Sequence, residues 1–456
     1  MRFLRNLSLL ATLIFSPFLA LPADYANLIM VEPSRRENPT VYLHFVGDAE
    51  FGALLRNTLI RCDWFKLVDK PEEAVYRLEA SLADGKFGYA LYDGDVVRAS
   101  GEGNISGNQR DFIYAQVNNL MANSFGHFPV RLCGSRIAFV ANTGKAKEIM
   151  TCNFDGSDVR QMTRNDTIST EPAWWPDSTM FAYTCYTGST TGIVQYDFVG
   201  RRQRLLCKLP GLNSCPAISP DGHSMALSLS QDHQVDLYVM RIADQSLFRV
   251  TQDQNVEASP AWSPRMDQIC FTSDKVGIGK PRLYLIAPSD GTATPLRPTL
   301  YVFGKNDRVP VSTGDIGASQ VSPCWSPVSN KIAYSVLACG SYKIAIVDMS
   351  PAGSNAVDIF GDFMRRDANG YKALLLTREN DGNWEDPSWA PDGRHLVCTR
   401  NVDGRRTLWQ LDSWYGTAMP IPGDNSDIDR SLPAWSGIMA PDPRSAKPEN
   451  PDLKGK

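Results

Sequence analysis

A serine nucleophile is the first chemistry to look for, and the residues around Ser224 come nearest to one. Serine hydrolases carry the nucleophile in a G-x-S-x-G turn, whereas Gly222-His-Ser-Met-Ala226 lacks the last glycine. An apolar strand begins at Met225, so we interpret this segment as a structural turn and strand. A hydrolase domain is therefore not expected.

Histidines, cysteines and carboxylates could hold a metal, but their spacing does not favour one. The five histidines are scattered and form no i, i+4 pair. The ten cysteines contain no C-x-x-C pair, which argues against a zinc ribbon or a thioredoxin-like site. Asp236 and Asp274 could bind calcium, although no loop has a recognisable calcium-binding pattern. We expect no metal, no cofactor and no enzyme activity.

The composition is that of an ordinary globular protein. The chain has 456 residues, of which 21% are charged and 43% hydrophobic, and its formal net charge is −4. It has no basic run, whereas nucleic acid and anionic lipid both require a positive footprint. Neither is expected as a partner. Cys270 and Cys398 fall in apolar strands, where a free thiol behaves as a small hydrophobic group, and the pairing of the other cysteines stays open.

The first 23 residues have the pattern of a secretory signal. Two arginines precede the apolar stretch Leu7–Phe15, which is too short to span a bilayer. Pro17 and Pro22 disfavour the alternative of an N-terminal anchor helix. We expect residues 1–23 to be a signal peptide cut near Ala23, and the mature chain to be exported to the periplasm without a membrane span.

A repeated segment of the form Pro-Ala-Trp-Ser-Pro organises the chain from about residue 131 onward. Its copies are Glu171-Pro-Ala-Trp-Trp-Pro-Asp177, Cys215-Pro-Ala-Ile-Ser-Pro-Asp221, Ser259-Pro-Ala-Trp-Ser-Pro264, Ser322-Pro-Cys-Trp-Ser-Pro327, Asp386-Pro-Ser-Trp-Ala-Pro-Asp392 and the truncated Leu432-Pro-Ala-Trp-Ser436. Proline cannot donate to a strand ladder and belongs at an edge or a strand start. Tryptophan offers a large surface that can lie between neighbouring sheets. The repeat therefore predicts architecture rather than catalysis.

An apolar strand recurs with the repeat at a nearly constant spacing. Its middle residues are Ala138, Ala182, Ala226, Cys270, Ala333 and Val397, separated by 44, 44, 44, 63 and 64 residues. A period of 44 with about four short strands per unit is typical of a β-propeller blade. The longer units should carry their extra residues in loops, near 291–320 and 351–383. The first unit lacks a copy of the repeat, so the last copy should supply its missing strand and close the ring.

The residues before the repeats predict a small α/β domain, with Gly126-His-Phe-Pro129 as the linker. Asp48 is placed to cap a helix with an apolar face, and Asp93-Gly94 is a strong hairpin signal. The expected fold is thus a small α/β N-terminal domain followed by a six-bladed all-β propeller closed by a C-terminal strand. The expected divisions are 1–23 (signal), 24–130 (α/β domain), 131–437 (propeller) and 438–456 (polar tail).

The repeat, together with strands such as Asp236-Leu-Tyr-Val-Met240, resembles the PD40 or WD40-like propeller repeat. With the signal peptide, the α/β domain and the final Pro-Ala-Trp-Ser, the chain is similar to the TolB family of the Tol-Pal system. The resemblance covers nearly the whole mature chain. Ile218 stands where the family has Trp, Trp175 where it has Ser, and the loops of two units are longer than in the family.

The resemblance implies a monomeric periplasmic protein that binds other proteins. The implied partners are a Pal-like peptidoglycan-associated lipoprotein at the propeller rim and a TolA-like inner-membrane protein at the N-terminal segment 24–37. The implied role is in outer-membrane integrity and invagination during cell division. The positions that match the family's contacts are Leu212, Cys215, Ala258 and Ser259, and repeat equivalence adds Glu171 and Asp386 to the same rim. The implied switch residues are Asp24, Tyr25, Leu28, Ile29, Met30 and Val31.

Two of these sets of residues also have a purely structural interpretation. Glu171 and Asp386 could be solvated loop carboxylates, and the cluster Leu28 to Val31 could be an inert edge strand. The alternative function is a secreted propeller that binds another protein or ligand, with a propeller hydrolase or lyase less favoured.

Overall fold

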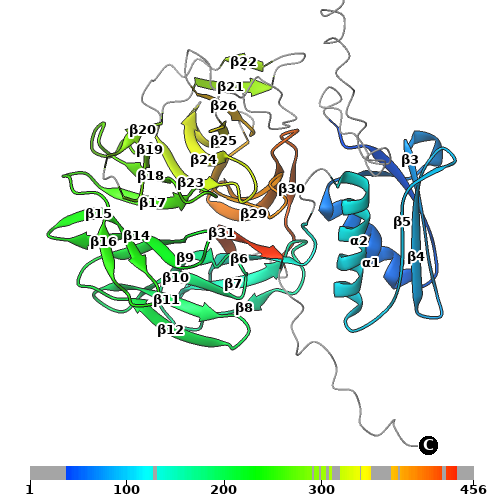
Figure 1. Ribbon diagram of the computed structural model, residues 1–456, viewed down its shortest axis with the longest axis horizontal. Helices are drawn as coiled ribbons and strands as arrows, with labels where there is room; N and C mark the ends of the chain where they lie inside the picture. Colours follow the sequence, from blue (N-terminus) through cyan, green and yellow to red (C-terminus); the bar gives the residue numbers. More distant parts are fainter. Residues whose placement is uncertain are drawn as a thin grey trace, which may run out of the picture.

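The computed structural model describes residues 37–126, 131–289, 292–296, 299–303, 308–310, 319–338, 340–350, 371–377, 381–423 and 428–438. The expected signal peptide and all six expected switch residues lie outside these ranges. So do most of the linker, much of both insertions and the tail beyond Ile438. Within the described residues, a small α/β unit lies beside a ring of sheets (Figure 1).

The α/β unit is a five-stranded sheet with two helices on one side (Figure 1). The strand order is β2-β1-β3-β4-β5, and β1 runs parallel to both of its neighbours. Its elements are β1 (Thr40–Val46), α1 (Ala49–Cys62), β2 (Lys66–Val68), the 3-10 turn Pro71–Glu73, β3 (Tyr76–Ala83), β4 (Lys86–Asp93), β5 (Val96–Asn104) and α2 (Gln109–Phe125).

Local sequence signals explain these elements. Asp48 caps α1, because its side chain accepts a hydrogen bond of 2.8 Å from the backbone N–H of Phe51. Leu55 and Leu59 follow Phe51 at helical spacing, and all three are buried. Gly94 has a φ of 57° in the β4–β5 turn, a conformation that suits glycine. The predicted cap and hairpin are both confirmed.

Six sheets form the propeller, each with its repeat-bearing strand innermost. Blade 1 consists of β31 (Asp429–Ile438), β6 (Ser135–Asn142), β7 (Lys147–Asn153) and β8 (Arg160–Gln161). Blade 2 consists of β9 (Ser169–Trp174), β10 (Met180–Tyr186), β11 (Thr191–Asp197) and β12 (Arg202–Cys207). Blade 3 consists of β13 (Asn213–Ile218), β14 (Ser224–Gln231), β15 (Gln234–Arg241) and β16 (Leu247–Arg249). Blade 4 consists of β17 (Glu257–Trp262), β18 (Ile269–Ser273), β19 (Arg282–Ile286) and β20 (Thr294–Pro295). Blade 5 contains β23 (Gln320–Trp325), β24 (Lys331–Ala338), β25 (Ser341–Asp348) and β26 (Lys372–Leu375). Blade 6 consists of β27 (Asn383–Trp389), β28 (His395–Val402), β29 (Arg405–Asp412) and β30 (Ala418–Pro420).

The chain's last strand closes the ring, as predicted. β31 pairs antiparallel with β6, with Ala434 opposite Ala138. The Ser436 hydroxyl accepts a hydrogen bond of 2.8 Å from the backbone N–H of Arg136. β31 thereby covers the edge of β6 that would otherwise be unpaired, and gives blade 1 an innermost strand like those of the other blades. The sixth copy of the repeat therefore supplies the strand that closes the propeller.

The first of the two long insertions departs from the expected pattern. Residues near 291–320 were expected to be loop, but they contain β21 (Thr299–Phe303) and β22 (Arg308–Pro310). β21 pairs in parallel with β26, which extends blade 5 to six strands. A β-rich stretch beside an exposed outer strand can satisfy its backbone by continuing that sheet. Spacing between repeats could not distinguish such an extension from a loop.

Polar side chains at the start of the innermost strands join blades 5, 6 and 1 to the blade that precedes each of them. Gln320 accepts a hydrogen bond from the backbone N–H of Leu283 at 3.2 Å, and Asn383 accepts one from that of Tyr342 at 2.9 Å. The Asp429 carboxylate accepts one from the Arg406 backbone N–H at 3.0 Å across the ring closure. These side chains thereby pair backbone N–H groups that would otherwise be left without a partner between blades.

Candidate functional site

The residue that precedes the repeat's first proline adopts a left-handed backbone in all six blades. The φ values at Glu171, Cys215, Ser259, Ser322, Asp386 and Leu432 lie between 49° and 55°. The pairing of each innermost strand with the next shifts register at this point, as in β9 and β17. A bulge there re-aims the side chain, and the following proline needs no ladder partner for its nitrogen. We call these six residues the pre-proline ring.

Three members of the ring form one arc of contacts. The Glu171 carboxylate accepts hydrogen bonds of 2.7 Å from the Cys215 backbone N–H and from the Thr184 hydroxyl. The Cys215 thiol lies 3.4 Å from the other Glu171 oxygen. Burial, and then the Glu171 carboxylate, raise the pKa of the Cys215 thiol to about 12, while the backbone N–H of Ser259 opposes the rise. The thiol is therefore a neutral packing group rather than a nucleophile.

The other three members form a second arc. The Asp386 carboxylate accepts hydrogen bonds from the hydroxyls of Ser322 (3.1 Å) and Thr399 (3.2 Å). Thr399 also accepts one from the Leu432 backbone N–H at 3.1 Å. Burial, and then repulsion by Glu385, raise the pKa of Asp386 to about 6. Glu171 and Asp386 are thus half-buried strand residues, and the alternative reading of both as solvated loop carboxylates is wrong.

The remaining expected rim residues lie beside the ring. Leu212 immediately precedes β13 and donates its backbone N–H to the Ser230 hydroxyl at 3.1 Å. Ala258 is half-buried, and its carbonyl accepts a hydrogen bond of 2.9 Å from Thr272. The structure therefore brings Glu171, Cys215 and Ser259 into contact, and it separates Asp386 into the second arc.

Sequence reasoning missed Ser322 and Leu432 as ring members, although the repeat spacing marks both.

The channel inside the ring is apolar. Its cavity has a volume of about 490 Å³ and is lined by the prolines, alanines and tryptophans of the repeat. No Asp, Glu, Lys, Arg or His lies among the described lining residues. The indole N–H groups of Trp174, Trp262 and Trp389 each donate to a backbone carbonyl of the preceding blade at 3.0–3.1 Å. The tryptophans therefore lie between blades as predicted, and they also form the channel wall.

Exposed apolar side chains surround the mouth that holds the pre-proline ring. In an antiparallel blade the end of the second strand and the turn after it lie beside the start of the innermost strand, as the pairing of Glu257 with Ser273 shows. Large exposed apolar side chains occupy these places in several blades: Ile168, Tyr186, Val256, Val276, Ile278, Leu337 and Val402. Ile278 is 96% exposed. We call this set the apolar rim, and sequence reasoning did not find it.

The α/β unit packs at the opposite end of blade 6. There the indole N–H of Trp64 donates to Asp392 at 3.2 Å, and Asp392 belongs to the turn that ends the fifth repeat. The Arg394 guanidinium donates to Asp412 at 2.6 Å and to Asn38 at 2.5 Å. It also lies 4.7 Å from the Trp64 ring centroid. The apolar rim is thus the end of the propeller that this contact leaves open.

A fully buried histidine completes this contact between the two units. His395 Nδ1 lies 2.6 Å from Asp392, and its Nε2 lies 3.6 Å from Asp63 of the α/β unit. Burial alone would lower the pKa of His395, but the adjoining carboxylates raise it to about 10. Asp63, His395 and Asp412 lie close enough together to suit a metal ion. The Arg394 guanidinium already occupies both oxygens of Asp412, so this set does not fit a metal site.

The fold and the channel together define a class: an α/β unit joined to a six-bladed β-propeller whose repeats line the channel. The family model described as the TolB beta propeller domain matches residues 131–307. The chain is 32% identical over 153 residues to a protein TolB homolog of Chlorobium luteolum, covering 34% of each protein. It is 23% identical over 287 residues to the Tol-Pal system protein TolB of Francisella tularensis, covering 55% of this chain and 61% of that protein. The chain therefore spans about one third to three fifths of these relatives.

The fold is also that of a solved TolB. The crystal structure of TolB from Acinetobacter baumannii superposes with a TM-score of 0.70 at 20% identity, covering 88% of this chain and 97% of that one. The expected resemblance to TolB is thus confirmed. The Francisella tularensis relative is named for the Tol-Pal system and not for a catalysed reaction. No helix within the described residues is long and apolar enough to cross a membrane.

Proposed function

We propose that this protein is the periplasmic propeller of a Tol-Pal system and binds a Pal-like lipoprotein at the apolar rim and pre-proline ring. The similarity of the chain to a Tol-Pal system protein supports its assignment to such a system. The apolar rim is the observation that supports this binding face, because exposed apolar groups gathered on one face are typical of protein interaction sites.

The ring itself suits recognition rather than chemistry. Its backbone is fixed by the bulges, and two of its side chains are half-buried carboxylates whose oxygens are already hydrogen-bonded. A partner would meet a shaped surface that needs little reordering on binding, which reduces the entropic cost of association. Ala258 and Ser259 are small and leave room for a partner's side chains in blade 4.

A direct binding measurement tests the proposed face. We expect Ile278→Glu to weaken binding to the purified soluble domain of a Pal-like lipoprotein at least tenfold, because it places a charge in an apolar contact. Folding should be unaffected, since Ile278 is 96% exposed. Phe248→Glu is the matched control, because Phe248 is 54% exposed on β16, the outer strand of blade 3. Equal affinity of both variants and the parent protein would refute this face.

We further propose that the segment 24–37, which carries Asp24, Tyr25, Leu28, Ile29, Met30 and Val31, contacts a TolA-like protein. Its docking is proposed to be coupled to binding at the propeller, so deleting residues 24–32 should change the affinity for both partners. Unchanged affinities for both would contradict the coupling. A pull-down from envelope extract tests the alternative function, a secreted propeller with a different partner. Recovery of a protein unrelated to Pal, in place of a lipoprotein, would favour that alternative.

A further inference from the structure

A second cavity lies on the outer flank of blades 1 and 2, away from the apolar rim. It has a volume of about 310 Å³. Blade 1 contributes Arg160, Met162 and Arg164 from β8 and the residues after it, and blade 2 contributes Tyr196, Phe198 and Arg201 from the end of β11 and its turn. This volume is at the lower end of the range for small-molecule sites. We call it the arginine pocket.

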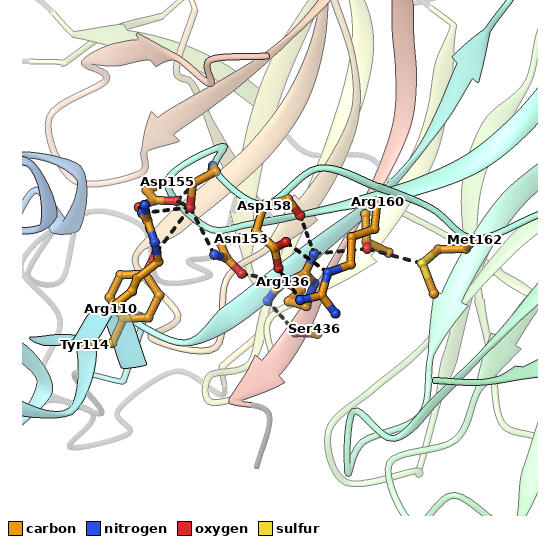
Figure 2. Close-up of polar contacts among 11 residues, drawn as sticks. Arg110, Tyr114, Arg136, Asn153, Asp155, Asp158, Arg160, Met162 and Ser436 are labelled. Carbon is orange, nitrogen blue, oxygen red and sulfur yellow. Dashed lines mark hydrogen bonds and ion pairs between the residues drawn. The ribbon is translucent and has the colours of Figure 1, made fainter. Parts of the chain in front are cut away.

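The pocket carries an excess of positive charge. Arg160 pairs with Asp158 at 2.8 Å, but the same carboxylate also pairs with the buried Arg136 at 2.8 Å (Figure 2). Neither Arg164 nor Arg201 forms a salt bridge or a side-chain hydrogen bond with any described residue. One carboxylate therefore serves two guanidinium groups, while two further guanidinium groups at the pocket are left without an anion.

The walls of the pocket strengthen its electrostatic field. Tyr196 and Phe198 are buried, and Met162 lies beside them on blade 1. The Arg136 guanidinium lies 5.6 Å from the centroid of the Phe198 ring, on the blade 1 side. Aromatic walls exclude water from one side of a bound ion, and charges interact more strongly where the local dielectric is low.

The backbone at Arg201 is unfavourable for a residue with a side chain. Its φ is 53°, in the left-handed region that suits glycine, and it follows Gly200, whose N–H is held by Asp197 at 2.7 Å. Such a conformation costs roughly 1 kcal/mol for a residue other than glycine. Asp158 and Gln245 adopt the same left-handed conformation in the corresponding turns of blades 1 and 3, so the conformation is a property of this turn.

We propose that the arginine pocket binds a small dianion with oxygen acceptors, either a phosphoryl or a dicarboxylate ligand. Guanidinium groups donate paired hydrogen bonds to both kinds of anion. Two unpaired arginines and one shared arginine on opposite sides of the cleft would neutralise two negative charges. This site is independent of the proposed partner-binding face, because it lies on the flank and not at the channel mouth.

Equilibrium dialysis of the full-length protein with radiolabelled inorganic phosphate, and separately with radiolabelled succinate, tests the proposal. We expect saturable binding of one equivalent of at least one of these anions, weakened by added sodium chloride. The double variant Arg164→Gln, Arg201→Gly should bind at least tenfold more weakly. Glycine suits the backbone at residue 201, so this variant should keep its melting temperature.

Arg204→Gln is the matched control, because Arg204 is an exposed arginine on β12 of blade 2 that does not line the pocket. It should bind like the parent protein. Tighter binding of phosphate would assign a phosphoryl ligand, and tighter binding of succinate a dicarboxylate. Absence of saturable binding by the parent protein, or equal binding by the double variant, would overturn the proposal.

Discussion

Replacing His395 should remove a pH-dependent part of the protein's stability. His395 is fully buried between Asp392 of the propeller and Asp63 of the α/β unit. The adjoining carboxylates raise its pKa from the ordinary value of about 6.5 to about 10 in the folded protein. The folded state therefore binds the proton more tightly than the unfolded chain. The resulting stabilisation is complete below pH 6.5 and is lost as the pH rises through 10.

The size of the effect follows from this shift. Each pKa unit corresponds to about 1.4 kcal/mol, so about 3 kcal/mol should be lost between pH 6.5 and pH 9.5. The adjoining groups do not titrate in this window, because the pKa of Asp392 is lowered by His395 despite its burial, and that of Arg394 is raised by Asp412 despite its burial. The loss should therefore come from the histidine.

Urea unfolding at both pH values measures the loss. The free-energy difference between the parent protein and His395→Gln should shrink by about 3 kcal/mol from pH 6.5 to pH 9.5. Tryptophan fluorescence is a suitable signal, since Trp64 contacts Asp392 directly. His44→Gln, which changes an exposed histidine on β1, should show no such trend. A difference that stays constant with pH would refute the argument that His395 is protonated in the folded protein.

Three further substitutions test contacts within the propeller. Asn383→Leu leaves the Tyr342 N–H unpaired between blades and should cost about 1–3 kcal/mol in urea unfolding, so a neutral result would contradict its role in joining blades 5 and 6. Burial raises the pKa of Glu257 to about 7, so its ionised form is penalised in the folded state and Glu257→Gln should gain stability relative to the parent as the pH rises from 4.5 through 7. Equal differences at pH 4.5 and pH 8 would count against this. Ser436→Ala removes the acceptor for the Arg136 N–H at the ring closure and should lower the melting temperature by a few degrees in calorimetry.

Much of the fold could be predicted because it depends on local and periodic signals. The cap at Asp48, the turn at Gly94 and the repeat spacing each act over a few residues or recur at a fixed interval. Closure of the ring by Leu432-Pro-Ala-Trp-Ser436 followed from one missing and one surplus strand. The extra strands β21 and β22 could not be predicted, because they pair with β26 rather than with a neighbour in sequence.

The candidate site was only partly predictable. Repeat equivalence indicated that Glu171, Cys215, Ser259 and Asp386 occupy matching positions, and the structure agrees. It could not indicate that Asp386 would accept hydrogen bonds from Ser322 of the preceding blade, because that contact exists only after two blades pack together. The apolar rim was missed for a similar reason, since its members lie in different blades and form no sequence pattern.

The sequence by itself determined the number of blades, the order of the two units and the strand that closes the ring. Tertiary structure alone decided which polar groups meet across the contacts between the units and between the blades. Trp64 and Asp392 are 328 residues apart, and neither local propensity nor a 44-residue period relates them. The arginine pocket likewise joins residues from two blades. Periodic patterns specify elements that repeat, whereas charge pairs across interfaces depend on how those elements dock.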